Sequence, residues 1–97
     1  MTTIALSARA LSDLERLREF LLETDPAAAD STVALILAAA DILEYHPLVG
    51  RLAESGLREL VISRGRTGYL ALYRYDEARD RILVLGIRHQ REAGYAS

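Results

Sequence analysis

The chain has 97 residues, enough for one domain with a modest hydrophobic core. It contains no cysteine, which excludes a disulfide framework, a thiol nucleophile and a cysteine-ligated metal, and its two histidines are too few to favour a histidine metal cluster. The net charge of −2 is unevenly distributed between the two halves of the chain. Residues 1–47 carry three arginines and eight acidic residues, whereas residues 48–97 carry nine arginines and six acidic residues.

All twelve basic residues are arginine. The lack of lysine has two equally good explanations, a compositional bias of the source genome and a functional cause. The segregation of charge is more informative, because guanidinium groups bind phosphate and carboxylate groups through forked, planar donation. It fits a second half that meets nucleic acid or an acidic protein.

The N-terminal segment has no charged stretch followed by an apolar one, so we expect no signal peptide. The longest apolar run, Val33–Ala40, is too short to span a bilayer. These two observations predict a cytoplasmic protein that has no membrane contact.

The first half of the chain predicts a short strand and a helix. Thr2–Leu6 alternates weakly, as a strand that joins a later sheet would. A helix then runs to about Thr24, with Ser7 as its N-cap, or alternatively Ser12 with Glu15 as a capping box. Its expected apolar stripe is Leu11, Leu14, Leu17, Leu21 and Leu22, and its expected wet side includes Arg9, Asp13, Arg16 and Glu23.

A second helix is predicted from about Pro26 to Glu44, with Asp25 as its cap. Two helices joined so tightly form an antiparallel hairpin. The expected buried face of the second helix is Val33, Ile36, Leu37, Ala40 and Leu43. His46-Pro47 ends the helix, and Leu48–Leu57 is predicted to be a loop whose apolar side chains Leu48, Val49 and Leu52 are tucked in.

Three apolar runs of strand length follow, Leu60–Ile62, Tyr69–Tyr75 and Ile82–Ile87. The short polar connections between them join neighbouring antiparallel strands, which predicts a three-stranded meander. The fold class is therefore α+β: an N-terminal strand, then an antiparallel helical hairpin packed on one face of a small, mainly antiparallel sheet that ends in the meander. We expect one domain over residues 1–97.

Three segments of the second half occur in a recognisable order and spacing: RELVI at 58–62, YLALYRY at 69–75 and IRHQRE at 87–92. With them, nearly the whole chain resembles the RelE/ParE superfamily of bacterial toxins from type II toxin–antitoxin modules, and in particular its ParE or plasmid-stabilisation branch. The resemblance implies a cognate antitoxin, encoded adjacently, that neutralises the toxin. It implies no cofactor and no metal.

The family implies two alternative activities. RelE-like members cut mRNA in the ribosome, and ParE-like members bind DNA gyrase and trap it on cleaved DNA. In the nucleases, two lysines and an arginine on the meander stabilise the pentacoordinate phosphate, and by register these places fall near Val61, Ser63 and Leu70, none of which is cationic. This departure favours the gyrase-binding reading.

Three residues keep the alternative of a metal-free mRNA endoribonuclease open. His89 and Tyr95 lie where the family has a basic residue and a tyrosine, and the two could act as general acid and base beside Arg88. For His89, a surface histidine at a strand end is the simpler interpretation. The residues expected to contact the target, whichever it is, are Arg64, Arg66, Arg74, Arg88, His89 and Arg91.

The second meander strand presents two faces. Tyr69, Tyr73 and Tyr75 share one, which we expect to pack against the helices. Leu70, Leu72 and Arg74 share the other, which we expect to be an exposed stripe on which the antitoxin docks. A third hypothesis, a non-toxic relic or plain binding module, is supported by the mild overall charge.

Overall fold

The computed structural model of the chain describes residues 2–64 and 67–95, apart from the side chains of residues 63, 64 and 67. The elements follow the predicted order: β1 (Thr3–Leu6), α1 (Ala8–Thr24), α2 (Pro26–Asp41), β3 (Arg58–Arg64), β4 (Thr67–Asp76) and β5 (Arg81–His89). Between α2 and β3 lie two short 3-10 turns, η1 (Ile42–Glu44) and η2 (Glu54–Gly56), and a two-residue strand, β2 (Arg51–Leu52), which the sequence did not predict.

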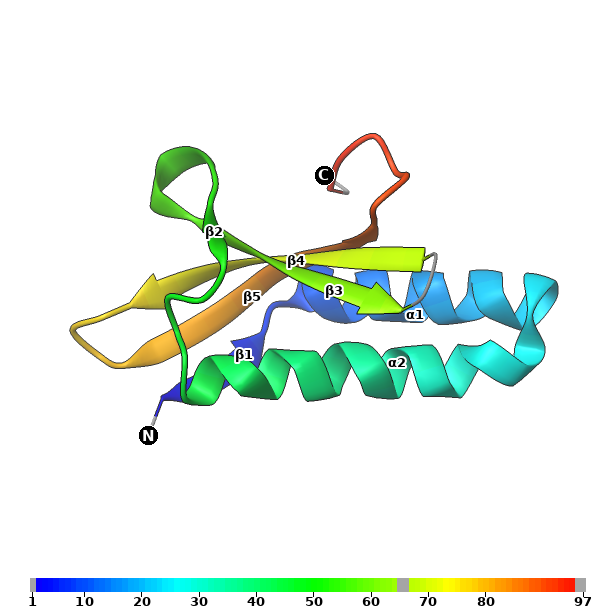
Figure 1. Cartoon of the computed structure of the whole chain (residues 1–97), viewed down its shortest axis with the longest axis horizontal. Helices are drawn as coiled ribbons and strands as arrows, with labels where there is room; N and C mark the ends of the chain where they lie inside the picture. The colour runs from blue at the N-terminus through cyan, green and yellow to red at the C-terminus, as the bar shows by residue number, and fades with distance from the viewer. Residues whose placement is uncertain (1, 65–66, 96–97) are drawn as a thin grey trace.

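The five strands form one sheet in the order β1-β5-β4-β3-β2. The β3-β4-β5 meander is antiparallel as predicted, and β1 joins it by pairing in parallel with β5. The two helices cover one face of this sheet, while the C-terminal segment turns back on the other side (Figure 1). The α+β architecture with a helical hairpin on one face is therefore confirmed.

A β-bulge interrupts the pairing of β4 with β5. Leu72 pairs with Gly86 but Tyr73 pairs with Val84, so Leu85 is an extra residue on β5. A bulge reverses which residues of a strand face which side. Ile82 and Val84 face the helices before it, and Ile87 and His89 face them after it.

Two side chains from the start of α1 stabilise the bulge. The Ser7 hydroxyl, whose oxygen also accepts the Ala10 N–H and caps α1, donates to the Leu85 carbonyl at 3.1 Å. The Asp13 carboxylate accepts the Ile87 N–H at 2.8 Å. Ser7 rather than Ser12 is therefore the N-cap. Asp13, expected on the wet side, is 2% exposed because it satisfies a buried backbone donor of the sheet.

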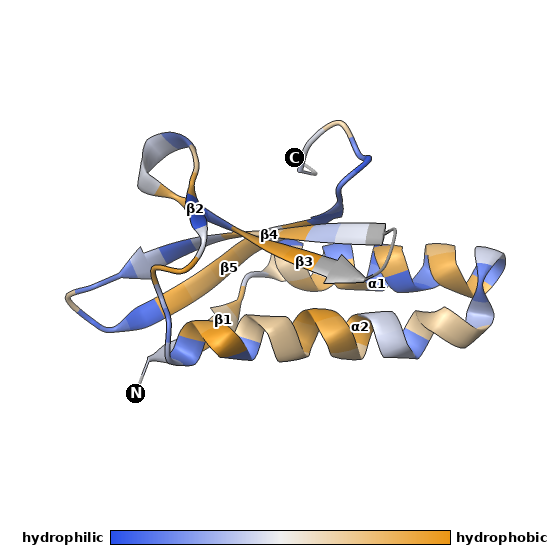
Figure 2. Ribbon diagram, in the orientation of Figure 1, coloured by the Kyte–Doolittle hydropathy of each residue, from blue (hydrophilic) through white to orange (hydrophobic). Residues whose placement is uncertain are grey.

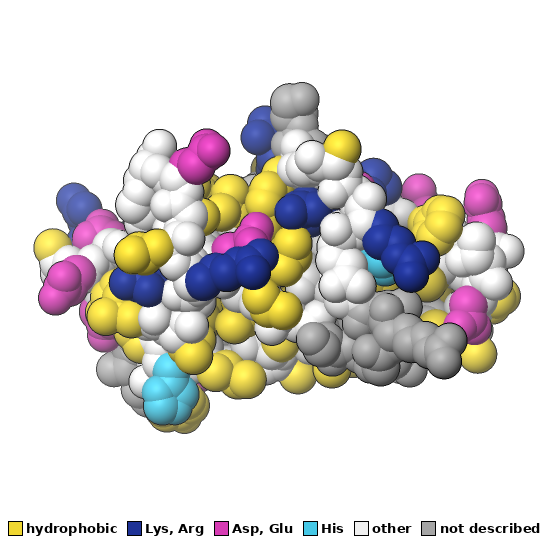
Figure 3. Space-filling model, turned by 45° about the horizontal axis from the view of Figure 1, so that its top comes forward, with side chains coloured by type: hydrophobic (Ala, Val, Ile, Leu, Met, Phe, Trp, Pro, Cys, Tyr) yellow, Lys and Arg dark blue, Asp and Glu magenta, His cyan; other side chains and the backbone are white. Residues whose placement is uncertain are grey.

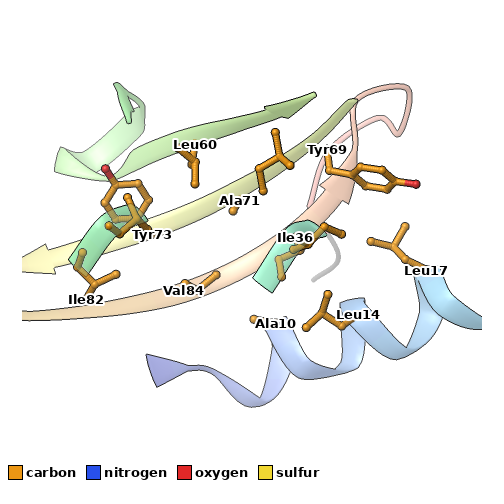
Figure 4. Close-up of a cluster of buried hydrophobic side chains, with 13 residues drawn as sticks. Ala10, Leu14, Leu17, Ile36, Leu60, Tyr69, Ala71, Tyr73, Ile82 and Val84 are labelled. Atoms are coloured by element: carbon orange, nitrogen blue, oxygen red, sulfur yellow. The ribbon is translucent and has the colours of Figure 1, made fainter. Parts of the chain in front are cut away.

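The core lies between the helices and the sheet (Figure 4). Tyr69 and Tyr73 are buried in it, and Tyr75 packs against it, which confirms the predicted helix-facing side of β4. The helix stripes are narrower than predicted, since Leu11, Leu22 and Leu37 are exposed. The core side chains that the helices and η1 supply are Ala10, Leu14, Leu17, Ile36 and Leu43.

The helix of residues Pro26–Glu44 is long and apolar enough, by length and composition alone, to cross a membrane. Its apolar composition has an internal cause, because Ile36, Ala40 and Leu43 face the core. The colouring of Figure 2 shows apolar residues around much of α2.

Candidate functional site

The end of β5 presents consecutive residues to opposite faces of the sheet. Arg88 pairs with Leu70 on the face away from the helices, and His89 pairs with Tyr69 on the face toward them. This placement is a consequence of the bulge, because uninterrupted alternation from Ile82 and Val84 would have turned Arg88 inward. The candidate residues thus divide into two groups, one on each face.

On the helix side, His89 lines a pocket of about 560 Å³ between α1 and the end of the sheet. Its ring meets Tyr69 edge-on at 5.2 Å between centroids, and its Nδ1 accepts the Arg91 N–H at 3.1 Å. Arg16 in this pocket donates to the Glu92 carboxylate at 2.9 Å. The lining residues are Arg16, Leu17, Phe20, Leu21, Tyr69, His89, Arg91 and Glu92.

This pocket differs from a phosphate-binding site. It offers two guanidinium groups, but that of Arg16 is paired with Glu92 and Asp13. The other lining side chains are mainly apolar. A dianionic phosphate would meet the Glu92 carboxylate as well as the cations, so the pocket suits an apolar side chain better than an anion.

On the opposite face, Tyr95 is fixed across the sheet. Its hydroxyl donates to the Glu59 carboxylate at 2.6 Å, and Glu59 also accepts from Arg51 Nε at 2.9 Å. The Tyr95 ring lies over Gly86, where a Cβ atom would come within 3.0 Å of it. The side chains of this face are mixed in type, with apolar groups between arginines and carboxylates (Figure 3).

Arg88 holds the C-terminal segment to this face. Its guanidinium lies 5.1 Å from the Tyr95 ring centroid, and Nη1 donates to the Glu92 carbonyl at 2.7 Å. Its Nε is buried and has no hydrogen-bond partner within the described residues. Glu92 completes the attachment, because its carboxylate accepts the His89 N–H at 2.9 Å as well as the Arg16 guanidinium.

The protonation states follow from these contacts. Burial and the bond to the Glu59 carboxylate raise the pKa of the Tyr95 hydroxyl far above its ordinary range. Burial also raises the pKa of Glu59, but hydrogen bonds from Tyr95 and Arg51 and the charges of Arg51 and Arg88 outweigh it, so that the pKa lies below its ordinary value. Near neutral pH, Tyr95 is therefore a protonated donor to an ionised carboxylate.

The predicted catalytic pair does not converge. His89 and Tyr95 lie on opposite faces of the sheet, and the hydroxyl that would have to exchange a proton is already bound to Glu59. The expectation that the two act together as acid and base is not supported by this geometry.

The other predicted residues are also dispersed. Arg74 is exposed on the face away from the helices, and Arg91 lies at the pocket on the helix side. Arg66 and the side chain of Arg64 lie outside the described residues. The predicted target-binding arginines therefore do not form one cluster among the described residues.

The stripe expected to be exposed on β4 is largely covered. Leu70 is 6% exposed and Leu72 is half-buried, which makes the expectation of an open apolar stripe wrong for Leu70. The C-terminal segment turns back on this side of the sheet, and Arg88, which pairs with Leu70, contacts it at Tyr95 and Glu92. Val61, beside Leu70 on β3, is 51% exposed.

Three acidic residues that organise this region were not predicted as site residues: Asp13, Glu59 and Glu92. Each acts through a partner that is distant in sequence, namely Ile87, Tyr95 and Arg16. The only signal for Glu59 is its place beside Arg58 in RELVI, which indicates no more than pairing on the sheet. For Asp13 and Glu92 the sequence offers no signal. Within the described residues, no group of three or more His, Asp or Glu side chains could hold a metal ion.

Comparison with known proteins decides the family. Residues 4–94 match the family model described as "ParE toxin of type II toxin-antitoxin system, parDE". The chain belongs to the RelE/ParE superfamily of type II toxins. Toxin RelE3 of Caulobacter vibrioides is 40% identical to this toxin over 93 residues, which are 95% of this chain and 98% of that one. Toxin RelE1 of the same organism is 39% identical over 72 residues, covering 74% and 77% of the two chains.

Two solved structures share the fold of this toxin. The chromosomal ParDE system from P. aeruginosa superposes with a TM-score of 0.78 at 22% identity, covering 92% of this chain and 96% of that one. The toxin–antitoxin complex RelBE2 from Mycobacterium tuberculosis gives a TM-score of 0.66 at 26% identity, covering 92% and 98%. One of these structures is a ParDE system and the other a RelBE system, so membership of the family does not decide between gyrase and mRNA as the target.

Proposed function

We propose that this toxin arrests growth by binding DNA gyrase, the activity that its resemblance to the ParE branch implies, and that it does so without cutting RNA. The main support is the composition of the sheet face at the places where the nucleases carry cations. Val61 and Leu70 are paired with each other there, so these two places are apolar. An apolar surface contributes nothing to stabilising a pentacoordinate phosphate.

The acid–base groups give further support. Because His89 and Tyr95 lie on opposite faces, no phosphodiester on one face is within hydrogen-bond reach of both. A tyrosine whose pKa is raised is also a poor base near neutral pH.

A specific observation favours the alternative, a RelE-like, ribosome-dependent mRNA endoribonuclease. The curated relatives at about 40% identity are named RelE toxins, and Arg88 lies directly against the Tyr95 ring. In this alternative the ribosome would supply the groups that the toxin lacks.

We further propose a cognate antitoxin as the cellular partner, because both structural neighbours come from toxin–antitoxin systems. We place the toxin in the cytoplasm, where gyrase and ribosomes act. Docking of the antitoxin on Leu70, Leu72 and Arg74 stays a prediction. Leu70 is buried in the free toxin, whereas Arg74 is exposed.

The deciding experiment adds purified toxin to gyrase with plasmid DNA, alongside the toxin bound to its antitoxin as a control. We expect the free toxin to inhibit supercoiling and to accumulate cleaved DNA, while primer extension on translated messages shows them intact. Unaffected gyrase together with cuts at the ribosomal A site, lost in His89→Ala and Arg88→Ala, would establish the nuclease instead. If induction causes no growth arrest, the chain is a non-toxic relic.

A further inference from the structure

The segment between α2 and β3 carries large apolar side chains that point into solvent. Five of them are between 49% and 72% exposed, although the sequence predicted that three of these would be tucked in. The segment runs up one end of the molecule, from the end of α2 to the edge of the sheet (Figure 1), and is apolar along its middle (Figure 2). We call it the apolar ridge, and its members are Ile42, Tyr45, Leu48, Val49 and Leu52.

Hydrogen bonds from two side chains of the sheet hold the backbone of the ridge in place. Tyr73, whose ring is fully buried in the core, donates its hydroxyl to the Pro47 carbonyl at 2.8 Å and accepts the Gly50 N–H at 2.9 Å. Arg58 donates from Nη1 to the carbonyls of Leu48 and Gly50, at 3.1 and 2.8 Å. Tyr73 from the core and the half-buried Arg58 thus satisfy four backbone groups of a surface loop.

A rigid, exposed apolar surface is a costly feature unless a partner covers it. Because the loop is already ordered, a partner that binds it does not have to pay the conformational entropy of fixing it. The five side chains of the cluster are uncharged and include a tyrosine, and the buried centre of a protein interface is likewise apolar, depleted of charged residues and enriched in aromatic ones.

The charged residues around the ridge indicate which charge the surface of its partner carries. Asp41, Glu44 and Glu54 flank it, and within the described part of the chain none of them forms an ion pair. Of the nearby cations, Arg51 pairs with Glu59, and Arg58 binds the loop carbonyls but keeps its charge, so three carboxylates face one guanidinium that has no acidic partner among the described residues. The ridge is therefore an apolar surface with an acidic rim.

An acidic rim repels phosphates, which argues against nucleic acid as the occupant. It also argues against a second copy of the chain, since a two-fold contact would set the same carboxylates against each other. What fits is a protein surface that is apolar at its centre and carries lysine or arginine around it.

We propose that the apolar ridge is the surface through which the toxin grips its target protein, and that the target's complementary surface is apolar with a basic rim. This inference rests on the proposed function in one respect, namely that the target is reached by protein contact. It is independent of which protein the target is, and it assigns antitoxin binding to other surfaces.

The test compares two matched double variants of the full-length toxin. Leu48→Ser with Val49→Ser changes the ridge, and Leu11→Ser with Leu22→Ser changes two other exposed leucines, on α1, as a control. We expect the ridge variant to lose growth arrest on induction and to bind gyrase at least about tenfold more weakly, while the control behaves as wild type. Both variants should keep the wild-type melting temperature and still co-purify with the antitoxin.

A second pair tests the sign of the charge. Glu54→Arg reverses the rim, and Glu77→Arg reverses an exposed acid in the β4–β5 turn. We expect weaker gyrase binding, by about threefold, for the first only, with the difference shrinking at high salt.

The outcomes separate the two proposals. If wild type arrests growth without affecting gyrase but the ridge variant does not arrest growth, gyrase is the wrong target and the ridge inference holds. If the folded ridge variant arrests growth as wild type does, the inference is overturned. It is also overturned if that variant loses antitoxin binding while it keeps toxicity, or if wild type arrests nothing.

Discussion

The Tyr95 hydroxyl donates to the Glu59 carboxylate at 2.6 Å, and the two residues are 36 positions apart in the chain. This bond fixes the C-terminal segment across the face of the sheet opposite the helices. Glu92, bound to Arg16 and to the His89 N–H, fixes the same segment from the other side. Access to Arg88, which contacts Tyr95 and Glu92, is therefore coupled to the attachment of the C-terminal segment.

Removing the hydroxyl in Tyr95→Phe should destabilise the toxin by about 1.5–3 kcal/mol, because hydrogen bonds to charged groups contribute this much. The denaturant midpoint should fall with an unchanged m-value. Tyr45→Phe is the matched control, since Tyr45 is 67% exposed and should show no change. Equal midpoints for both variants would mean that the bond contributes nothing to stability.

The Glu59 carboxyl makes stability depend on pH in the acidic range. Its pKa is lowered in the folded state, so its contribution is fully present above the unfolded value of about 4.3 and is lost as the pH falls through the lower folded pKa. We expect Glu59→Gln to be less stable than wild type at pH 7, with the two unfolding curves converging below about pH 4. Asp76 and Asp80, whose pKa values are also lowered, titrate in both proteins and do not affect this comparison. A difference that is constant from pH 7 to pH 3 would contradict the assignment.

Asp13→Ala should cost about 2 kcal/mol or more. The substitution leaves the Ile87 N–H buried without its acceptor at the β-bulge, and a buried unsatisfied donor carries a penalty of this order. Glu15→Ala, two residues along the same helix and exposed, should change stability by less than about 0.5 kcal/mol. Chemical denaturation of both variants, with amide hydrogen exchange at Ile87, measures the effect. Unchanged exchange at Ile87 in Asp13→Ala would show that the bond is dispensable.

Gly50→Ala should destabilise the toxin by about 1–3 kcal/mol through overpacking. A Cβ atom there would lie 2.6 Å from the ring and hydroxyl of Tyr73, which is fully buried and cannot move aside. Gly94→Ala is the control, because a methyl group at that position would meet no atom within 4 Å among the described residues. Thermal unfolding followed by circular dichroism compares the two, and an equally stable Gly50→Ala would show that the loop can shift away from Tyr73.

The candidate site was predicted less well than the fold. Arg88, His89 and Tyr95 are close in the sequence, and we predicted that they act together. Alternation along β5 puts Arg88 and His89 on opposite faces, but the bulge at Leu85 decides which of the two faces the helices, and no residue pattern around Leu85 predicts that bulge. The importance of Glu59 and Glu92 was equally invisible, because each is defined by a partner on another element.

The sequence by itself determined the order of elements, the helical hairpin and the meander, because helix and strand periodicity, caps and short connections are local properties. It also carried the family, through segments whose order and spacing are specific. Only the tertiary structure decided which side chains are covered: Asp13 is buried at the bulge, Leu70 is buried on the face away from the helices, and the ridge of residues 42–52 is exposed. These outcomes depend on contacts such as Asp13 with Ile87, 74 residues apart, and local periodicity contains no information about such pairs.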